Sequence, residues 1–84
     1  MSDTLDREAV ETYVTDALVE LGVDRSAIVP DASIDDLEVD SLDMVELSQS
    51  LRKDLRIPVK PKDFDEVETL GQLLKVCCEK AGLA

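Results

Sequence analysis

The chain contains no histidine and no tryptophan, and it has one tyrosine and one phenylalanine among 84 residues. Without histidine, a serine nucleophile has no imidazole base to take its proton, so a Ser-His-acid catalytic arrangement is excluded. Aromatic side chains are few while 44% of the residues are hydrophobic, so the core must be built from Leu, Val, Ile and Ala. This composition favours helices packed on helices in one small domain, residues 1–84.

Long apolar runs and paired cysteines are also missing. No run approaches the roughly 18–20 residues of a membrane span, and no segment resembles a signal peptide, so we expect a cytoplasmic protein that does not enter a membrane. Cys77 and Cys78 are adjacent in sequence, which makes a poor disulfide and fits a reducing compartment. No further Cys or His is there to complete a zinc site. We interpret both as small core residues, with Cys78 partly exposed.

Basic side chains are scarce, because nine Lys and Arg face twenty Asp and Glu, giving a net charge of -11. Such a field repels nucleic acids and anionic membranes, so we expect neither as a partner and expect partner surfaces to be basic. Residues 52–62 are the exception, with five basic side chains, one acidic side chain and a local charge of +4. The five, called the basic patch below, are Arg52, Lys53, Arg56, Lys60 and Lys62.

Three segments have the apolar spacing of an amphipathic helix: residues 4–21, 40–55 and 69–81. Gly22 and Gly82 follow the first and the last segment, where a terminating glycine is expected. Residues 23–40 form a long connection held by isolated apolar residues, and prolines after the second segment leave one helical turn over residues 62–66. We therefore predict an all-α fold, a small four-helix bundle with three longer helices, one short helix and a long first loop.

The second helix opens with Asp40-Ser41-Leu42. Asp40 can accept a backbone N–H at the helix start, and Asp43 adds favourable negative charge in the first turn. Ser41 therefore presents a hydroxyl beside unpaired N–H groups that tolerate a phosphodiester. An isolated serine in this place is a simple helix-start residue roughly nine times in ten. Here Leu42 and Val45 stay near the surface beside it, which indicates a docking surface around an attachment point.

The acidic loop before this serine contains the oxygen-bearing side chains that a metal site uses. Its polar residues are Asp31, Ser33, Asp35, Asp36, Glu38 and Asp40. An EF-hand loop needs glycine at the sixth position and glutamate at the twelfth, and this loop has neither. Loose binding of a divalent ion is an alternative, but a solvated acidic loop explains the pattern better, so we predict no metal site.

Residues 31–55, DASIDDLEVDSLDMVELSQSLRKDL, are similar to the central region of acyl carrier proteins, and the chain resembles that family in length and helix spacing throughout. The family signature at the start of the second helix corresponds to Asp40-Ser41-Leu42. The resemblance implies a free-standing, non-catalytic carrier with 4′-phosphopantetheine on Ser41 and acyl groups bound as thioesters to the arm's thiol. It also implies a monomer whose partners are a phosphopantetheinyl transferase and an acyl-loading enzyme, ketosynthase or acyltransferase.

The chain departs from the family pattern in two places. Glu38 stands where many members have glycine, so we expect a differently shaped loop. The basic patch stands where many members keep acidic residues, and electrostatic fit selects partners, so we predict a dedicated polyketide, specialised fatty-acid or lipopeptide pathway. An aminoacyl or peptidyl carrier is an alternative, which the acidic Asp40 and the negative first helix disfavour. A non-carrier acidic interaction module, with Ser41 incidental, is another.

Two residue sets complete these predictions. Residues for partner recognition are Asp40, Leu42, Asp43, Val45, Glu46, Gln49, Arg52 and Lys53. Residues expected to line an acyl pocket are Met44, Leu47, Leu51, Ile57 and Leu74, because they come from facing helical stripes and flexible aliphatic side chains can move to admit a chain.

Overall fold

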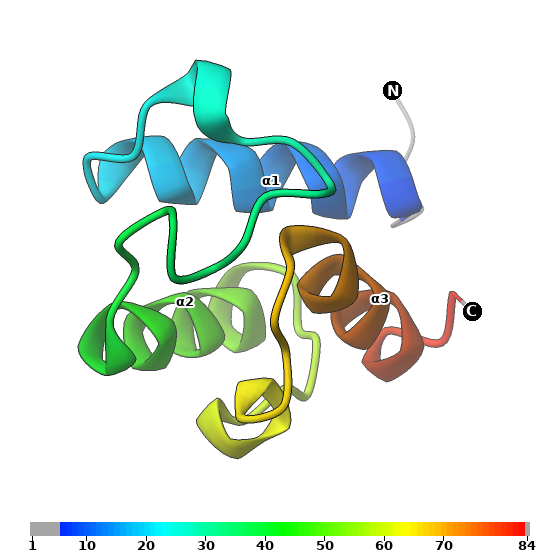
Figure 1. Cartoon of the computed structure of the whole chain (residues 1–84). Helices are drawn as coiled ribbons and strands as arrows, with labels where there is room; N and C mark the ends of the chain where they lie inside the picture. The colour runs from blue at the N-terminus through cyan, green and yellow to red at the C-terminus, as the bar shows by residue number, and fades with distance from the viewer. Residues whose placement is uncertain (1–5, 84) are drawn as a thin grey trace.

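The computed structural model describes residues 6–83 and is built from helices around one core (Figure 1). This part contains α1 (Arg7–Glu20), α2 (Ser41–Asp54) and α3 (Leu70–Lys80), with two short 3₁₀ turns, η1 (Arg25–Ala27) and η2 (Pro61–Phe64). In Figure 1, α1 crosses above α2 and α3, and η2 lies beneath them. The predicted small helical bundle with a long first loop is confirmed. No helix in residues 6–83 combines the length and apolarity needed to cross a membrane.

The short elements differ from the prediction. The expected turn at residues 62–66 begins earlier, at Pro61, and is a 3₁₀ turn rather than an α-helix. Pro61 fixes its own φ at a helical value, and the N–H of Lys60 donates to the Asp63 carboxylate at 2.8 Å, which holds the start of the turn. The turn η1 was not predicted, because three residues carry no periodic signal. The expected start of the first helix at residue 4 lies outside the described residues.

Both predicted glycine terminators are confirmed. At the end of α1, Gly22 has φ +100°, and the N–H of Val23 donates to the Leu18 carbonyl at 3.0 Å. At the end of α3, Gly82 has φ +80°, and the N–H of Leu83 donates to the Cys78 carbonyl at 2.8 Å. These are Schellman motifs, in which a left-handed residue lets the chain turn back and satisfy a terminal carbonyl.

The long first loop is fixed to the amino end of α3. The N–H of Leu70 donates to the Ala32 carbonyl, and that of Gly71 donates to the Pro30 carbonyl, each at 2.9 Å. A Cβ at position 71 would lie 3.1 Å from the Pro30 oxygen, so the close approach favours glycine. The sequence Thr69-x-x-Gln72 has the pattern of a capping box, and Thr69 caps α3 by accepting the Gln72 N–H at 3.2 Å. These contacts hold the first loop against α3 and so fix the direction in which the chain enters α2.

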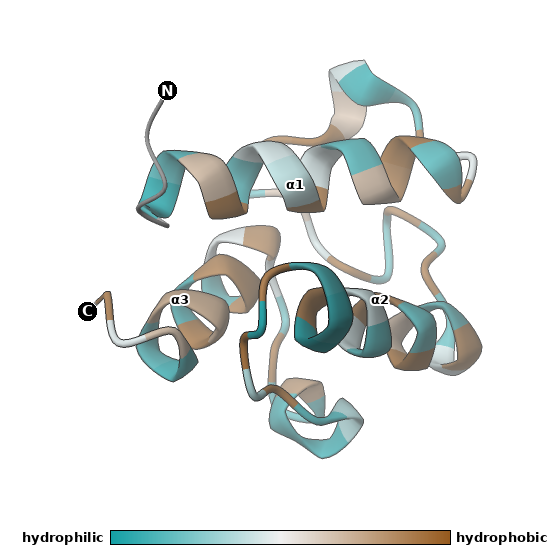
Figure 2. Cartoon of the chain, turned by 180° about the vertical axis from the view of Figure 1, so that it is seen from behind, coloured by the Kyte–Doolittle hydropathy of each residue, from teal (hydrophilic) through white to brown (hydrophobic). Residues whose placement is uncertain are grey.

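The core is aliphatic apart from Phe64 and two cysteines, and Figure 2 shows how hydrophobic residues run along α3. The buried residues of α3 are Leu70, Leu73, Leu74, Cys77 and Cys78. Cys78 is only 6% exposed, so the expected partial exposure is wrong. It follows Leu70 and Leu74 at intervals of four and lies on the same helix face. Burial raises the pKa of the Cys77 thiol to about 12.

Candidate functional site

Ser41 is the first residue of α2, and its side chain is exposed. The N–H of Asp43 donates to Asp40 Oδ1 at 2.9 Å, and the N–H of Asp40 donates to Asp43 Oδ2 at 3.3 Å. This reciprocal capping box confirms the predicted cap and holds the backbone on both sides of Ser41. The hydroxyl therefore stands on a rigid helix start.

The other serine hydroxyls within residues 6–83 are less available for modification, and Ser33 and Ser50 are half-buried. Ser48 is fully buried, and its hydroxyl donates to the Val45 carbonyl at 2.8 Å. Ser26 is exposed, but its hydroxyl donates to the Asp24 carboxylate at 2.9 Å. Ser41 makes no side-chain hydrogen bond within residues 6–83. It thus combines exposure with an unengaged hydroxyl.

A groove of about 260 Å³ begins at Ser41 and lies between α2 and η2. Its lining residues are Val39, Asp40, Ser41, Met44, Val45, Pro61, Phe64 and Asp65. Phe64, only 5% exposed, anchors η2 in the core, and Asp63 Oδ1 lies 3.7 Å from Lys80 Nζ on α3. We call this the serine groove. The wall formed by η2 was not predicted from the sequence. The signal that could have indicated it is Phe64, the single phenylalanine in a chain whose core is aliphatic.

The loop before Ser41 contains an unusual backbone conformation. Glu38 has φ +59°, in the left-handed region that costs an ordinary L-residue about 1–2 kcal/mol. Glycine adopts this region freely. Glu38 therefore bears strain in a conformation that glycine would adopt without it, and the expectation of a loop shaped differently from that of glycine-containing members stays a prediction. The acidic loop is otherwise solvated as expected, and no cluster suited to a metal ion occurs within residues 6–83.

The predicted recognition residues lie on different sides of α2. Leu42 is 65% exposed and, with Gln49 and Lys53, lies on the outward side. Val45 is half-buried and lines the serine groove. Glu46 instead lines a second groove, between α1 and α2. The set therefore surrounds the exposed part of α2 rather than forming a single face.

Most of the predicted acyl-pocket residues are packed in the core. Leu47 is 2% exposed, Leu51 and Ile57 are fully buried, and Leu74 is 6% exposed. Met44 is half-buried, packs against this core and also lines the serine groove. Leu47 lines the groove between α1 and α2, whereas the other three line neither groove. Met44 is thus the predicted pocket residue that links the serine groove with the core.

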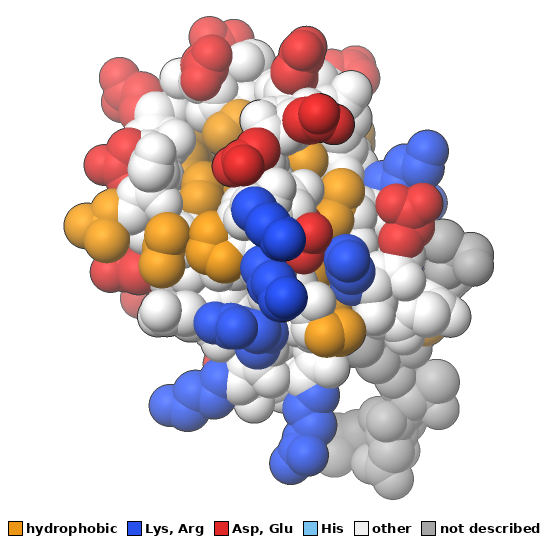
Figure 3. Space-filling model, turned by 90° about the horizontal axis from the view of Figure 1, so that it is seen from below, with side chains coloured by type: hydrophobic (Ala, Val, Ile, Leu, Met, Phe, Trp, Pro, Cys, Tyr) orange, Lys and Arg blue, Asp and Glu red, His pale blue; other side chains and the backbone are white. Residues whose placement is uncertain are grey.

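All five basic-patch residues are exposed, and Figure 3 shows Lys and Arg side chains gathered on one face with acidic side chains around its upper edge. No ion pair involves them within residues 6–83. Asp54, the acidic residue within this segment, accepts a hydrogen bond from the Tyr13 hydroxyl at 2.6 Å. Arg56 has φ +56°. The patch is therefore a positive surface at the carboxyl end of α2.

The sequence profile described as "Phosphopantetheine attachment site" matches residues 12–77. The match begins within α1, includes all of α2 and ends within α3. The chain belongs to this family. No solved structure matches the chain.

Members of the phosphopantetheine attachment site family carry a 4′-phosphopantetheine prosthetic group, are modified by phosphopantetheinyl transferases and work with pathway enzymes. The surroundings of Ser41 fit such a group. The exposed hydroxyl can form the phosphodiester, and the amino end of α2 favours its negative charge. The serine groove offers apolar contacts from Val39, Met44 and Phe64 for the arm beyond the phosphate.

Proposed function

We propose that Ser41 is the attachment residue and that the chain carries acyl intermediates as thioesters on the arm's thiol. The observation that supports this most is an unengaged serine hydroxyl on a capped helix start, at the mouth of a groove with both apolar and acidic walls. The arm itself supplies the thiol on which the cargo is bound. This chain holds the arm in position, because Asp40 and Asp43 fix the start of α2 and the walls of the serine groove contact the arm that extends from Ser41.

The proton of the Ser41 hydroxyl must be removed by the transferase. The chain has no histidine, and the neighbouring carboxylates of Asp40 and Asp43 accept backbone hydrogen bonds of the capping box. A transferase base would take the proton while the Ser41 oxygen bonds to the β-phosphorus of coenzyme A, and adenosine 3′,5′-bisphosphate would leave. The chain is thus a substrate and carrier rather than a catalyst.

Replacement of Ser41 tests this assignment. After incubation with coenzyme A and a phosphopantetheinyl transferase, wild type should gain the mass of one arm, and Ser41→Ala should gain none. Ser26→Ala, which removes another exposed serine hydroxyl, is the control and should load as wild type does. Circular dichroism should show an unchanged fold, because Asp40 rather than Ser41 provides the cap. Loading of Ser41→Ala would place the arm elsewhere.

An aminoacyl or peptidyl carrier is the alternative cargo class. The apolar groove wall of Val39, Met44 and Phe64 favours an aliphatic acyl chain. The same groove is also lined by Asp40 and Asp65, whose carboxylates can attract an ammonium on an aminoacyl cargo. Parallel loading assays with acyl-loading and aminoacyl-loading enzymes decide between them, and faster aminoacylation would reject the acyl assignment.

The cargo can be sheltered if Met44 moves and opens a route from the serine groove toward Leu47, Leu51, Ile57 and Leu74. Methionine suits this role, because its unbranched side chain changes rotamer easily. We expect the melting temperature to rise with acyl length as more apolar surface is buried. An unchanged melting temperature from short to long acyl groups would mean that the cargo stays in solvent.

We further propose that the carrier serves a dedicated polyketide, specialised fatty-acid or lipopeptide pathway. A ketosynthase or acyltransferase of that pathway would have to match both the acidic residues near Ser41 and the basic patch. The unpaired positive charges at the carboxyl end of α2 support this inference.

A further inference from the structure

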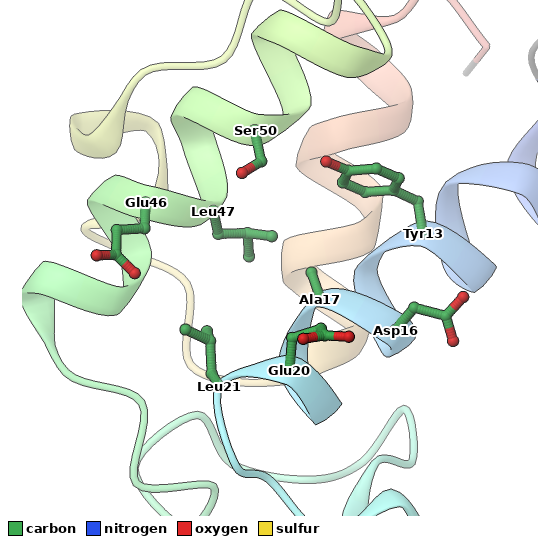
Figure 4. A pocket seen from close by; sticks show the side chains of 8 residues that line it. All are labelled: Tyr13, Asp16, Ala17, Glu20, Leu21, Glu46, Leu47 and Ser50. Carbon is green, nitrogen blue, oxygen red and sulfur yellow. The ribbon is translucent and has the colours of Figure 1, made fainter.

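A second groove lies between α1 and α2, with a volume of about 400 Å³ (Figure 4). The residues lining it are Tyr13, Asp16, Ala17, Glu20, Leu21, Glu46, Leu47 and Ser50. The five α1 residues recur at intervals of three and four, so they form one stripe along that helix. α1 approaches α3 and η1 more closely along its backbone than it approaches α2. We call it the α1–α2 groove.

This groove and the serine groove lie on opposite flanks of α2. At 100° per residue, Glu46, Leu47 and Ser50 are turned toward α1, whereas Ser41 and Val45 are turned toward η2. The helix itself therefore separates the two grooves. A molecule bound in the α1–α2 groove would leave the Ser41 hydroxyl accessible.

The chemistry of the α1–α2 groove is apolar within and acidic at the rim. The half-buried Ala17 and Leu21 provide the accessible apolar surface, with the almost fully buried Leu47 behind them, and Figure 4 shows the carboxylates of Glu20 and Glu46 on facing helices. Asp16 adds a third carboxylate, which pairs with Arg25 at 3.1 Å. Glu20 and Glu46 are exposed and make no ion pair within residues 6–83.

Two candidate occupants do not match this chemistry. The arm is tied to Ser41 on the other flank by an anionic phosphodiester, which the carboxylate rim disfavours. A second copy of the chain has its main positive segment at residues 52–62, but Ile57 and Val59 within it are fully buried. These two side chains are therefore not available to enter the groove of another copy together with the neighbouring positive charges.

We propose that the α1–α2 groove docks a helical segment of a partner protein that presents a leucine-like side chain flanked by Lys or Arg. The aliphatic side chain would lie on Ala17 and Leu21, in front of the buried Leu47, and the flanking cations would meet Glu20 and Glu46. This is the usual way in which an amphipathic helix binds an apolar groove. The site goes beyond the carrier function, because it can hold the carrier while Ser41 remains free.

The direct test is titration of the ¹⁵N-labelled protein with a defined probe. The probe is a synthetic helical peptide with leucines one turn apart flanked by Lys and Arg, compared with a version in which Glu replaces the basic residues. The basic peptide should shift the amide signals of Ala17, Leu21, Leu47 and Ser50, and the acidic peptide should not. Shifts centred on the outward side of α2, or the same shifts with both peptides, would overturn the proposal.

Matched charge variants separate docking from general attraction to an acidic protein. Glu20→Gln with Glu46→Gln should weaken binding about tenfold at low salt, since two exposed charge contacts are lost. Glu66→Gln with Glu79→Gln removes two exposed charges outside the groove and should have little effect. Equal weakening by both pairs would contradict the groove. Ala17→Leu keeps every charge, fills the floor and should also abolish the localised shifts.

Two further measurements distinguish other occupants. Comparing arm-bearing protein with and without an acyl group would reveal cargo in the groove through shifts at Leu21 and Leu47. Concentration-dependent shifts at those residues would reveal a second copy. Either result would overturn the partner assignment. Loading of Ser41 is measured separately by mass, so failure of the peptide experiment leaves the carrier function unaffected, and the reverse also holds.

Discussion

The two ends of α2 share a backbone feature and differ in charge. Glu38, just before the helix, and Arg56, just after it, are the two non-glycine residues within residues 6–83 that have positive φ. The amino end is acidic and contains Asp40 and Asp43, whereas the carboxyl end contains Arg52 and Lys53 in its last turn. Each end of α2 is therefore flanked by one residue with a strained backbone, and the side chains of these two residues have opposite charges.

This difference indicates how the helix is recognised. Negative charge at the amino end and positive charge at the carboxyl end both complement the helix dipole, so the arrangement favours α2 itself. The ends of a 14-residue helix lie about 20 Å apart, so one partner surface can contact both. The reactive hydroxyl lies only at the acidic end. In the proposed carrier the basic end would serve orientation and discrimination rather than chemistry.

Reversing the basic end should have the largest effect. Arg52→Glu with Lys53→Glu should slow association with the cognate ketosynthase about tenfold at low salt, and less at high salt. Folding stability should change little, since both side chains are exposed. The same variant should react faster with a ketosynthase of general fatty-acid synthesis. Stopped-flow association and turnover provide the measurements.

A matched control shows whether position or net charge matters. Arg25→Glu with Lys75→Glu changes the net charge equally outside the basic patch. It should slow the cognate ketosynthase less. If the two variants behave alike, the patch has no special role, and if neither changes the rate at low salt, the inference of a dedicated pathway loses its main support.

Relieving backbone strain should have an intermediate effect. Glu38→Gly and Arg56→Gly should each raise the free energy of unfolding by up to about 1 kcal/mol, because glycine adopts positive φ without strain. Urea denaturation measures this gain. Asp36→Gly, an exposed acidic position without positive φ, is the control and should lower stability. A loss at Glu38 or Arg56 would show that the side chain stabilises its left-handed residue.

The smallest expected effect depends on pH and concerns Asp54 at the carboxyl end. Burial, followed by the hydrogen bond to Asp54, raises the pKa of Tyr13 above its ordinary value. The folded state holds this proton more tightly, so the stabilisation is complete below about pH 10 and is lost as pH rises through the raised pKa. Tyr13→Phe should cost about 1 kcal/mol near pH 8, with a smaller difference near pH 11. A difference that stays constant with pH would contradict this account.

Local sequence signals predicted much of this structure. Gly22 and Gly82 ended their helices, Thr69 capped α3, and Asp40 capped α2, because each signal depends on residues within one turn. The helical stripes likewise predicted most of the core. Ser41 could be singled out because its cap and the absence of histidine are both visible in the sequence.

Features that depend on contacts distant in sequence could not be predicted. The approach of Pro30 to Gly71 and the packing of η2 beside Ser41 join segments without a shared local pattern. Positive φ at Glu38 was also missed, because glutamate carries no preference for it and the surrounding loop imposes it. Neither groove beside α2 follows from helix periodicity, which indicates the buried face but not the spacing of neighbouring elements.

The burial of Cys77 and Cys78 has a consequence for any cargo held as a thioester. A thioester is open to exchange with a nearby thiolate, which would move the acyl group onto the protein. Both cysteines are buried, and burial raises the pKa of the Cys77 thiol to about 12, so this thiol stays protonated at neutral pH. These are the chain's two cysteines. The cysteine thiols of the chain therefore do not react with the cargo, and exchange of the cargo is left to the thiol of the arm.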